Sequence, residues 1–307
     1  MVWYILSLIL GFVMLVKGAD FFVEGASGLA VRFRIPDLII GLTIVAMGTS
    51  APEAAVSIAA GFAGNADITI GNIVGSNILN TFVILGIASV IVTLHVEKST
   101  VRIELPFMLL CSALLLVLGL DGRITLVDGL LLWAAFLVYL GYLFVNAKRH
   151  PKEGEETRQR ALWLELLMIA GGLAVLVIGS KLAVSGASGL ARTIGISERC
   201  IGLTIVALGT SLPELFTSVI AARKGNADIA VGNIVGSNIF NILFVVGTTS
   251  LLVAVPFDAK FLIDSGFMIA SAVLLLLAVL PKQRLGRAAG AVMLVCYAVY
   301  FVYLCMT

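Results

Sequence analysis

The sequence contains few charged residues. Only 12% of its 307 residues are Asp, Glu, Lys or Arg, whereas soluble domains carry about 25%. Apolar residues make up 60% of the chain, and this imbalance excludes a soluble globular enzyme. The net charge is only +2, and no basic run is interleaved with aromatic residues. We therefore expect no nucleic-acid partner.

Cysteine and histidine are also scarce. The four cysteines lie singly in or beside apolar runs, without the paired spacing of a zinc or disulfide site: Cys111, Cys200, Cys296 and Cys305. The two histidines, His95 and His150, fall in or near predicted loops. No pair of nucleophile and base is therefore predicted at membrane depth, and we expect neither an enzyme nor a bound cofactor.

Long apolar runs dominate what remains. A membrane-spanning helix needs about 20 apolar residues, and ten such runs lie between polar breaks. They cover residues 2–30, 38–63, 68–93, 103–120, 125–146, 163–191, 199–222, 229–255, 261–280 and 287–305. We therefore predict an all-α, multi-pass membrane protein with ten transmembrane helices.

The chain also contains an internal repeat. GASGLA at 25–30 recurs at 186–191, and the same offset of 161 residues aligns GLTIVAMGTSAPE with GLTIVALGTSLPE. Each half holds five predicted spans, so the second half must enter the membrane from the opposite side, as in many secondary transporters. We predict two inverted repeats, 1–145 and 163–307, joined by a linker at 146–162.

The distribution of Lys and Arg predicts the orientation. Most of these residues lie in loops after odd-numbered spans, the linker included, and cytoplasmic loops carry the excess of positive charge. The linker is therefore predicted to be cytoplasmic and both termini to lie outside. The compact loops are typical of a bacterial or archaeal plasma-membrane protein.

Two acidic residues, Glu53 and Glu214, lie in the middle of predicted spans within the repeated motif GTS-x-PE. An ionisable side chain at that depth costs roughly 2.5–3.5 kcal/mol, and it is therefore a candidate for function. Because inverted repeats bring equivalent positions together, we expect the two carboxylates to meet near the membrane midplane.

A proline precedes each glutamate. Pro52 cannot donate to the carbonyl of Gly48, and Pro213 leaves the carbonyl of Gly209 free in the same way. Both helices should therefore break close to the glutamate. Irregular backbone at membrane depth is tolerated where it is packed in protein or lines a watery cavity, so the breaks indicate a site or a pathway.

Hydroxyl and amide side chains surround the glutamates. Thr49 and Ser50 share a helical face with Glu53, and GNIVGSNI-x-N forms a polar stripe on the following span. The stripe residues are Asn72, Ser76 and Asn80, with Asn233, Ser237 and Asn241 as their repeats. Such hard oxygen donors suit Ca²⁺ and can also hold Na⁺, whereas zinc and copper prefer nitrogen or sulfur.

The duplicated GTS-x-PE and GNIVGSNI-x-N motifs resemble the two alpha-repeats of the sodium/calcium exchanger family, of the prokaryotic type. The resemblance implies alternating access, with Ca²⁺ and Na⁺ competing between the second, third, seventh and eighth spans. It implies as ion ligands the carbonyls of Ala46 and Ala207 and the side chains of Thr49, Ser50, Glu53, Ser76, Asn80, Thr210, Ser211, Glu214, Ser237 and Asn241. Some family members carry an aspartate at one of the paired positions where this chain has Asn80 and Asn241, so a third carboxylate is absent here.

Several alternatives stay open at this point. Protons could replace Na⁺ as the counter-ion, because two carboxylates held close together favour proton uptake when no cation is bound. Another divalent cation could also take the place of Ca²⁺ as the substrate. A passive cation channel is a further alternative, although channels usually surround a pore with rings of ligands. Ser76, Asn80, Ser237 and Asn241 could also serve in interhelical hydrogen bonds, and Asn72, Asn77, Asn233 and Asn238 either brace helices or face the pathway.

The first and sixth spans carry further features. The small residues of GASGLA predict close helix packing, letting these long helices slide against the rest of the protein. Lys17, Asp20 and Glu24 share one helical face, and Lys181 occupies the repeat position of Asp20. These charges either form an intramembrane ion pair or extend towards the interface. The expected partners are Ca²⁺ and Na⁺ as transported substrates and the lipid bilayer, with no obligate protein partner.

Overall fold

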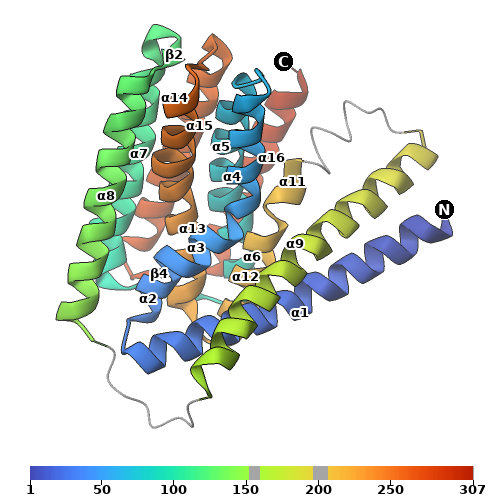
Figure 1. The fold of residues 1–307 in the computed structure, drawn as a ribbon, viewed down its shortest axis with the longest axis vertical. Helices are drawn as coiled ribbons and strands as arrows, with labels where there is room; N and C mark the ends of the chain where they lie inside the picture. Colours follow the sequence, from blue (N-terminus) through green and yellow to red (C-terminus); the bar gives the residue numbers. More distant parts are fainter. Residues whose placement is uncertain (152–159, 196–206, 307) are drawn as a thin grey trace.

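A computed structural model describes residues 1–151, 160–195 and 207–306. The chain forms a bundle of helices crossed by two long helices that run side by side (Figure 1). The two long helices are α1 (Val2–Phe33) and α9 (Leu162–Thr193). The predicted linker 146–162 falls partly outside the described residues.

The rest of the first half follows α1. Its elements are α2 (Asp37–Ile40), η1 (Gly41–Val45), α3 (Ala46–Thr49), α4 (Ala51–Phe62), α5 (Asp67–Leu79), η2 (Asn80–Ile84), α6 (Leu85–Ile91), β1 (Leu94–His95), η3 (Thr100–Glu104), α7 (Leu105–Leu118), η4 (Gly119–Asp121), β2 (Arg123–Ile124) and α8 (Leu126–Arg149). The elements η1, η2 and η3 are π-helical turns, and η4 is a 3₁₀ turn.

The second half repeats this order after α9. Its described elements are α11 (Ala207–Thr210), α12 (Leu212–Arg223), α13 (Ala227–Phe240), the π-helical η6 (Asn241–Val246), α14 (Gly247–Leu252), β3 (Val255–Pro256), α15 (Ala259–Val279), β4 (Arg284–Leu285) and α16 (Arg287–Met306).

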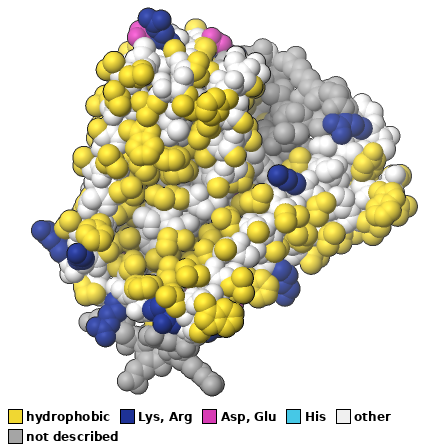
Figure 2. All heavy atoms as spheres, in the orientation of Figure 1, with side chains coloured by type: hydrophobic (Ala, Val, Ile, Leu, Met, Phe, Trp, Pro, Cys, Tyr) yellow, Lys and Arg dark blue, Asp and Glu magenta, His cyan; other side chains and the backbone are white. Residues whose placement is uncertain are grey.

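The chain is a multi-pass membrane protein. Among the described residues, eight helices are long and apolar enough to cross a membrane, and a bent pair, Asp37–Thr49 with Ala51–Phe62, adds a ninth. The span predicted at 199–222 begins outside the described residues and continues as α11 and α12. Figure 2 shows apolar side chains over the flank, while several Lys and Arg gather at the lower end.

Two composite helices form the centre of the bundle. In Ala227–Leu252, 94% of the most apolar stretch is buried, and in Ile68–Ile91 the share is 78%. In the other six single-helix spans among the described residues, only 17–39% of the most apolar stretch is buried, so most of their apolar surface faces outwards. The polar stripes of the repeated asparagine motif therefore run through the middle of the protein.

Glycines bring α1 and α9 into close contact. A Cβ atom added to Gly18 would lie 2.9 Å from the carbonyl oxygen of Gly172, and one on Gly25 would lie 2.9 Å from the carbonyl oxygen of Glu165. Both distances are too short for a real side chain. Gly25 of the GASGLA motif thus packs the long helices against each other, while Ser27 of the same motif accepts a hydrogen bond from Asn226 Nδ2 of the bundle at 2.9 Å.

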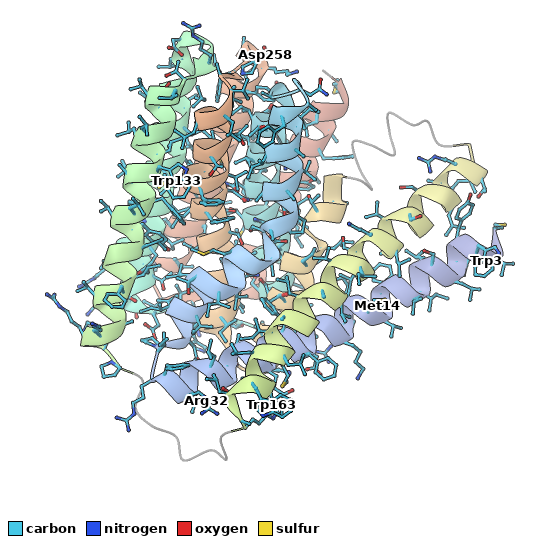
Figure 3. All side chains as sticks on the ribbon, in the orientation of Figure 1. Trp3, Met14, Arg32, Trp133, Trp163 and Asp258 are labelled. Atoms are coloured by element: carbon cyan, nitrogen blue, oxygen red, sulfur yellow. The ribbon has the colours of Figure 1, made fainter. Side chains whose placement is uncertain are left out.

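Ion pairs also join the two long helices. Arg32 Nε of α1 donates to Glu165 Oε2 of α9 at 2.7 Å, and Arg160, two residues before α9 begins, contacts Glu24 of α1. Figure 3 shows Arg32 and Trp163 at the same end of the molecule, with Asp258 at the opposite end. Close backbone contact and ion pairing make α1 and α9 a single packed unit.

Four short strands were not anticipated from the sequence. β1 pairs antiparallel with β4, and β2 pairs antiparallel with β3, so each pair joins the two halves. The repeat relates β2 to β4, yet these two strands lie at opposite ends of the molecule (Figure 1). Equivalent elements at opposite ends are the arrangement expected of inverted repeats.

Candidate ion-binding site

Two helix breaks form the framework of the site. The chain leaves helical geometry at Ser50, with φ −82° and ψ 4°, and at Ser211, with φ −90° and ψ 3°. The first break bends its span by 48°. Glu53 and Glu214 follow in the first turns of α4 and α12, where the partial positive charge of a helix N-terminus stabilises a carboxylate.

Each glutamate is bound by a serine of the other half. Ser50 Oγ donates to Glu214 Oε1 at 2.9 Å, and Ser211 Oγ donates to Glu53 Oε1 at 3.2 Å. Ser76 Oγ lies 3.3 Å from Ser211 Oγ and 3.5 Å from Glu53 Oε1. Both glutamates are completely buried. The two GTS-x-PE motifs therefore meet in one polar cluster.

Four oxygen atoms of this region are left without a donor. Glu53 Oε2, Glu214 Oε2, Asn80 Oδ1 and Asn241 Oδ1 are buried and have no hydrogen-bond partner among the described residues. They form two pairs related by the repeat. A buried acceptor without a partner costs about 1–3 kcal/mol, and more when it is charged. This arrangement is suited to a cation that several oxygens can share.

A second pair of asparagines positions the amide oxygens. Asn241 Nδ2 donates to Asn77 Oδ1 at 3.1 Å, and Asn80 Nδ2 donates to Asn238 Oδ1 at 3.1 Å. Asn77 Nδ2 in turn donates to the carbonyl of Asn238 at 3.1 Å. The amide N–H groups of Asn80 and Asn241 are thus used between the central helices, which leaves their oxygens free.

The backbone widens at the same two positions. The π-helical turns η2 and η6 begin at Asn80 and Asn241. Such turns are rare and often occur at functional sites. No local sequence signal predicts them, because the residues that follow, TFVI and ILFVV, are ordinary apolar helix residues.

The asparagines that open the two stripes brace the broken helices. Asn72 Nδ2 donates to Ser57 Oγ at 3.0 Å, and Asn233 Nδ2 donates to Ser218 Oγ at 2.9 Å. Each amide also lies 3.4 Å from the carbonyl oxygen of the glutamate in its own half. Of the two roles left open by the sequence, the structure shows bracing for both residues.

Other predicted ligands already make protein contacts. Thr49 Oγ1 lies 3.0 Å from Asn233 Oδ1 and 3.1 Å from the carbonyl oxygen of Val45. The carbonyl of Ala46 accepts from Ser50 N at 3.0 Å and from Ser237 Oγ at 3.4 Å. Ala207 begins α11, but its side chain is outside the description.

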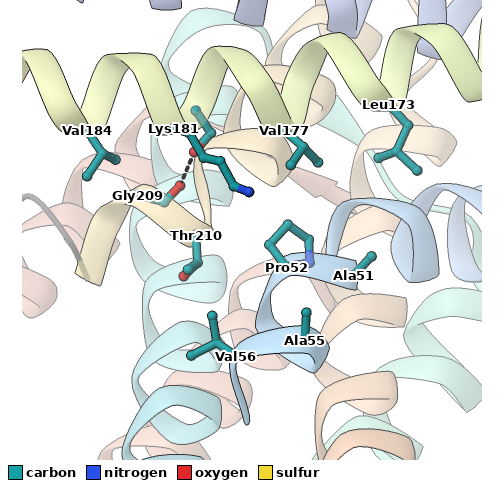
Figure 4. A pocket seen from close by; sticks show the side chains of 11 residues that line it. Ala51, Pro52, Ala55, Val56, Leu173, Val177, Lys181, Val184, Gly209 and Thr210 are labelled. Atoms are coloured by element: carbon teal, nitrogen blue, oxygen red, sulfur yellow. Dashed lines mark hydrogen bonds between the residues drawn. The ribbon is translucent and has the colours of Figure 1, made fainter. Parts of the chain in front are cut away.

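A cavity of about 410 Å³ adjoins the two breaks (Figure 4). Pro52 on α4, Thr210 on α11 and Lys181 on α9 contribute to its lining. Ser180 of α9 donates its hydroxyl to the carbonyl of Gly209, which is the carbonyl predicted to lose its helical partner. Sequence reasoning missed this contact, because Ser180 and Gly209 belong to different helices.

The donor set consists of oxygen atoms. In the part of the chain that the structure describes, no three His, Cys, Asp or Glu side chains come together. The two glutamates are instead accompanied by serine hydroxyls and asparagine amides. These ligand types favour Ca²⁺ or Na⁺ over metals that require nitrogen or sulfur.

Comparison with known proteins gives a consistent result. Residues 3–145 and 164–306 match the family described as sodium/calcium exchanger protein. The chain is 38% identical over 309 residues, 95% of both chains, to the putative antiporter CaxA of Alkalimonas amylolytica. It is 32% identical over 341 residues, 97% of both chains, to the sodium/calcium exchanger MaX1 of Methanosarcina acetivorans. A structure of the sodium-calcium exchanger NCX_Mj soaked with zero Na⁺ and Ca²⁺ has a TM-score of 0.87 at 30% identity, covering 99% of each chain.

Proposed function

The chain belongs to the sodium/calcium exchanger family of membrane transporters, and on that premise we propose that it exchanges Ca²⁺ for Na⁺ by alternating access. The proposed ligands are the twelve residues that the repeated motifs supply. The transported ions are the substrates, and neither a cofactor nor an obligate protein partner is part of the proposal.

The unpartnered oxygens of Glu53, Glu214, Asn80 and Asn241 carry this proposal. Ca²⁺ takes six to eight oxygen ligands in flexible geometry. The four free oxygens supply part of that shell, and the serine hydroxyls beside the glutamates can rotate to add lone pairs. Na⁺ can use the same oxygens in place of Ca²⁺.

Charge balance explains why binding of the two ions would be coupled. Two ionised glutamates carry two negative charges, which one Ca²⁺ or two Na⁺ neutralise. Because both ions need the same carboxylates, binding of one displaces the other. In this proposal the packed unit of α1 and α9 moves relative to the ion ligands and exposes them to one side of the membrane at a time.

We also propose the inverted arrangement and orientation derived from the sequence. Residues 1–145 and 163–307 form the repeats, the linker 146–162 is cytoplasmic and both termini lie outside. Each strand pair contains one strand from each half, and the equivalent strands β2 and β4 lie at opposite ends of the molecule. Both observations support inverted repeats. Labelling single introduced cysteines with a membrane-impermeant reagent in intact cells tests the orientation, and labelling of the linker from outside would contradict it.

Exchange of Ca²⁺ for protons is the second candidate. It draws support from the pairing of Glu53 with Glu214, since two protons neutralise the pair as fully as one Ca²⁺ does. Asn80 and Asn241 provide no further carboxylate that would change this balance.

Uptake of ⁴⁵Ca²⁺ into liposomes that contain the purified protein tests both candidates. An outward Na⁺ gradient is compared with an equal K⁺ gradient and with a pH gradient at clamped voltage, and protein-free liposomes give the background. We expect uptake with the Na⁺ gradient alone. Uptake driven only by the pH gradient would replace Na⁺ by H⁺, and a current without coupled uptake would indicate a channel.

A further inference from the structure

The two halves differ in how their turns contact the long helices. The turn between α12 and α13 contacts α1, where Asn226 Nδ2 donates to Ser27 Oγ at 2.9 Å. The repeat relates this pair to Asn65 and Ser188. Ser188 Oγ is buried on α9 without a hydrogen-bond partner among the described residues, and Asn65 is exposed in the turn between α4 and α5. One half therefore forms a hydrogen bond that the other half leaves unmade.

The packing of the long helices shows the same difference. Phe12 of α1 packs against Phe216 of α12, with the ring centroids 5.9 Å apart. Their repeat counterparts, Leu173 of α9 and Ala55 of α4, both line the cavity of about 410 Å³ (Figure 4). The surface that is packed between α1 and α12 is thus separated by a cavity between α9 and α4.

Exposure along the two broken spans follows this pattern. Val56 of α4, in the cavity wall, is 44% exposed, while its counterpart on α12, Thr217, is completely buried. The two positions are equivalent in the repeat, so the difference reflects the position of the packed unit of α1 and α9. Movement of this unit away from α12 and towards α4 would exchange the two environments.

We propose that the hydrogen bond of Asn226 with Ser27 and an equivalent bond of Asn65 with Ser188 are alternatives, each formed in one of two conformations. This inference rests on the proposed function, because alternating access requires a second conformation. A hydroxyl group buried without a partner is destabilising. Movement that pairs Ser188 with Asn65 would remove this cost, and it would separate Ser27 from Asn226. The four side chains position the long helices and are not proposed ion ligands.

Exchange of equivalent bonds would keep the two conformations close in energy. A contact formed in one conformation stabilises that conformation alone, so a single hydrogen bond would favour one state. With one such bond available at each end, breaking the first is offset by forming the second. The ion pair of Lys224 with Asp20 lies outside this balance, because its counterparts, Ala63 and Lys181, cannot form it.

The rates at which a maleimide labels two reporter cysteines test the inference without requiring transport. Val56→Cys and Thr217→Cys are introduced singly into the purified full-length protein, after its four native cysteines have been replaced by serine. Val56→Cys reports the described conformation and Thr217→Cys reports the other, so the ratio of their labelling rates follows the equilibrium between the two. Each reporter is combined with one of four variants: Ser27→Ala, Asn226→Ala, Asn65→Ala and Ser188→Ala.

We expect Ser27→Ala to lower the ratio of the Val56→Cys rate to the Thr217→Cys rate by about two- to tenfold, as for the loss of one hydrogen bond. Ser188→Ala should raise this ratio by a similar factor, because it removes the bond of the other conformation. Combining Ser188→Ala with Asn65→Ala should shift the ratio no further than either change alone, since both remove the same bond.

Ser7→Ala is the matched control. It is the same substitution on α1, but Ser7 Oγ donates to the carbonyl of Leu182 at 2.9 Å within the packed unit of α1 and α9. The ratio should therefore stay at the wild-type value. Gel filtration verifies that each variant is folded, and Asn226→Ala removes the same bond if Ser27→Ala does not fold.

Shifts in the same direction in Ser27→Ala and Ser188→Ala would overturn this inference, and so would no shift in Ser188→Ala and Asn65→Ala. Additive effects of Asn65→Ala and Ser188→Ala would show that the two side chains do not pair. A cysteine at Thr217 that stays unreactive in every variant would also overturn the inference. The proposed function has a separate test, because it fails if the wild-type protein takes up no ⁴⁵Ca²⁺ in liposomes.

Discussion

The two halves of the molecule are nearly identical at the glutamates but differ where the long helices meet the bundle. Within the site, each half contributes one proline break, one glutamate and one asparagine stripe. The serine of each half donates a hydrogen bond to the glutamate of the other half. On the flanks the halves have diverged more. Three examples of differing pairs related by the repeat are Ala19 and Ser180, Asp20 and Lys181, and Ala63 and Lys224.

This contrast separates two physical requirements. An exchanger must bind the same ions in both of its conformations, which favours a site built equally from both halves. The relative energy of the two conformations depends on the contacts that form in only one of them. Divergence on the flanks can therefore adjust the conformational equilibrium without altering the ion ligands.

The equivalence of the glutamates gives the largest expected effect. Glu53→Gln and Glu214→Gln should each lower Ca²⁺ affinity by more than about 100-fold, because even groups that only support a metal ligand contribute about 10- to 100-fold. Each change is nearly isosteric, so the protein should remain folded. ⁴⁵Ca²⁺ binding measures the loss, and an unchanged elution profile in gel filtration verifies the fold. Full Ca²⁺ binding by either variant would disprove the shared acidic site.

The supporting asparagines should show a smaller effect, again equal in the two halves. Asn77→Ala removes the acceptor that holds the amide of Asn241, and Asn238→Ala does the same for Asn80. We expect each variant to bind Ca²⁺ at least about tenfold more weakly, since the amide oxygens lose their fixed orientation. Binding titrations provide the comparison. If only one of the two variants bound Ca²⁺ much more weakly, the two asparagines would contribute unequally to Ca²⁺ binding despite their equivalent positions.

Much of the framework could be predicted from the sequence. For the spans whose two ends are described, the apolar runs indicated the bounds to within a few residues, and the prolines indicated breaks next to Glu53 and Glu214. The repeat also predicted that these two glutamates meet. The spans and the breaks were predictable because each signal lies in one short segment of chain, and the meeting of the glutamates was predictable because the repeat relates their two positions.

Contacts between distant segments could not be predicted in the same way. The asparagine motif predicted a polar stripe, but not that Asn77 and Asn238 would take up the amide groups and leave the oxygens of Asn80 and Asn241 free. That outcome depends on the exact register of α5 against α13. The strand pairs and the Ser180–Gly209 contact likewise depend on the relative placement of helices, which propensity and spacing do not specify.

The difference between Ser180 and its repeat counterpart Ala19 can be tested by its effect on stability. Ser180→Ala would leave the buried carbonyl of Gly209 without its donor, and we expect a loss of about 1–3 kcal/mol in stability. The matched control is Ser188→Ala on the same helix, because Ser188 Oγ has no hydrogen-bond partner among the described residues. Thermal melting in detergent should show a lower midpoint for Ser180→Ala alone. Equal midpoints would mean that another donor satisfies the carbonyl.

Lys224 forms an ion pair with a long helix in one half of the molecule only. It lies just after α12 and pairs with Asp20 on α1, where it also donates to the Asp20 carbonyl at 3.2 Å and lies 3.9 Å from Glu24 Oε2. The counterpart of Lys224 is Ala63, which cannot form such a pair. Unlike the pair of Arg32 with Glu165, this contact joins a long helix to the bundle, so movement of the long helices would break it.

The expected effect of Lys224→Met is therefore a small shift between conformations. An exposed ion pair contributes about 0.2–1 kcal/mol, so the population of the described conformation should fall relative to the other by a factor of about 1.4 to 5. The rate at which a maleimide labels a cysteine introduced at Val56, in the cavity wall, would report the shift. Arg32→Met, which breaks a pair within the long-helix unit, should leave the rate unchanged, and high salt should remove the Lys224 effect. If Lys224→Met and Arg32→Met changed the labelling rate equally, the Lys224–Asp20 pair would not favour one conformation over the other. The difference between Lys224 and Ala63 would then not affect the conformational equilibrium.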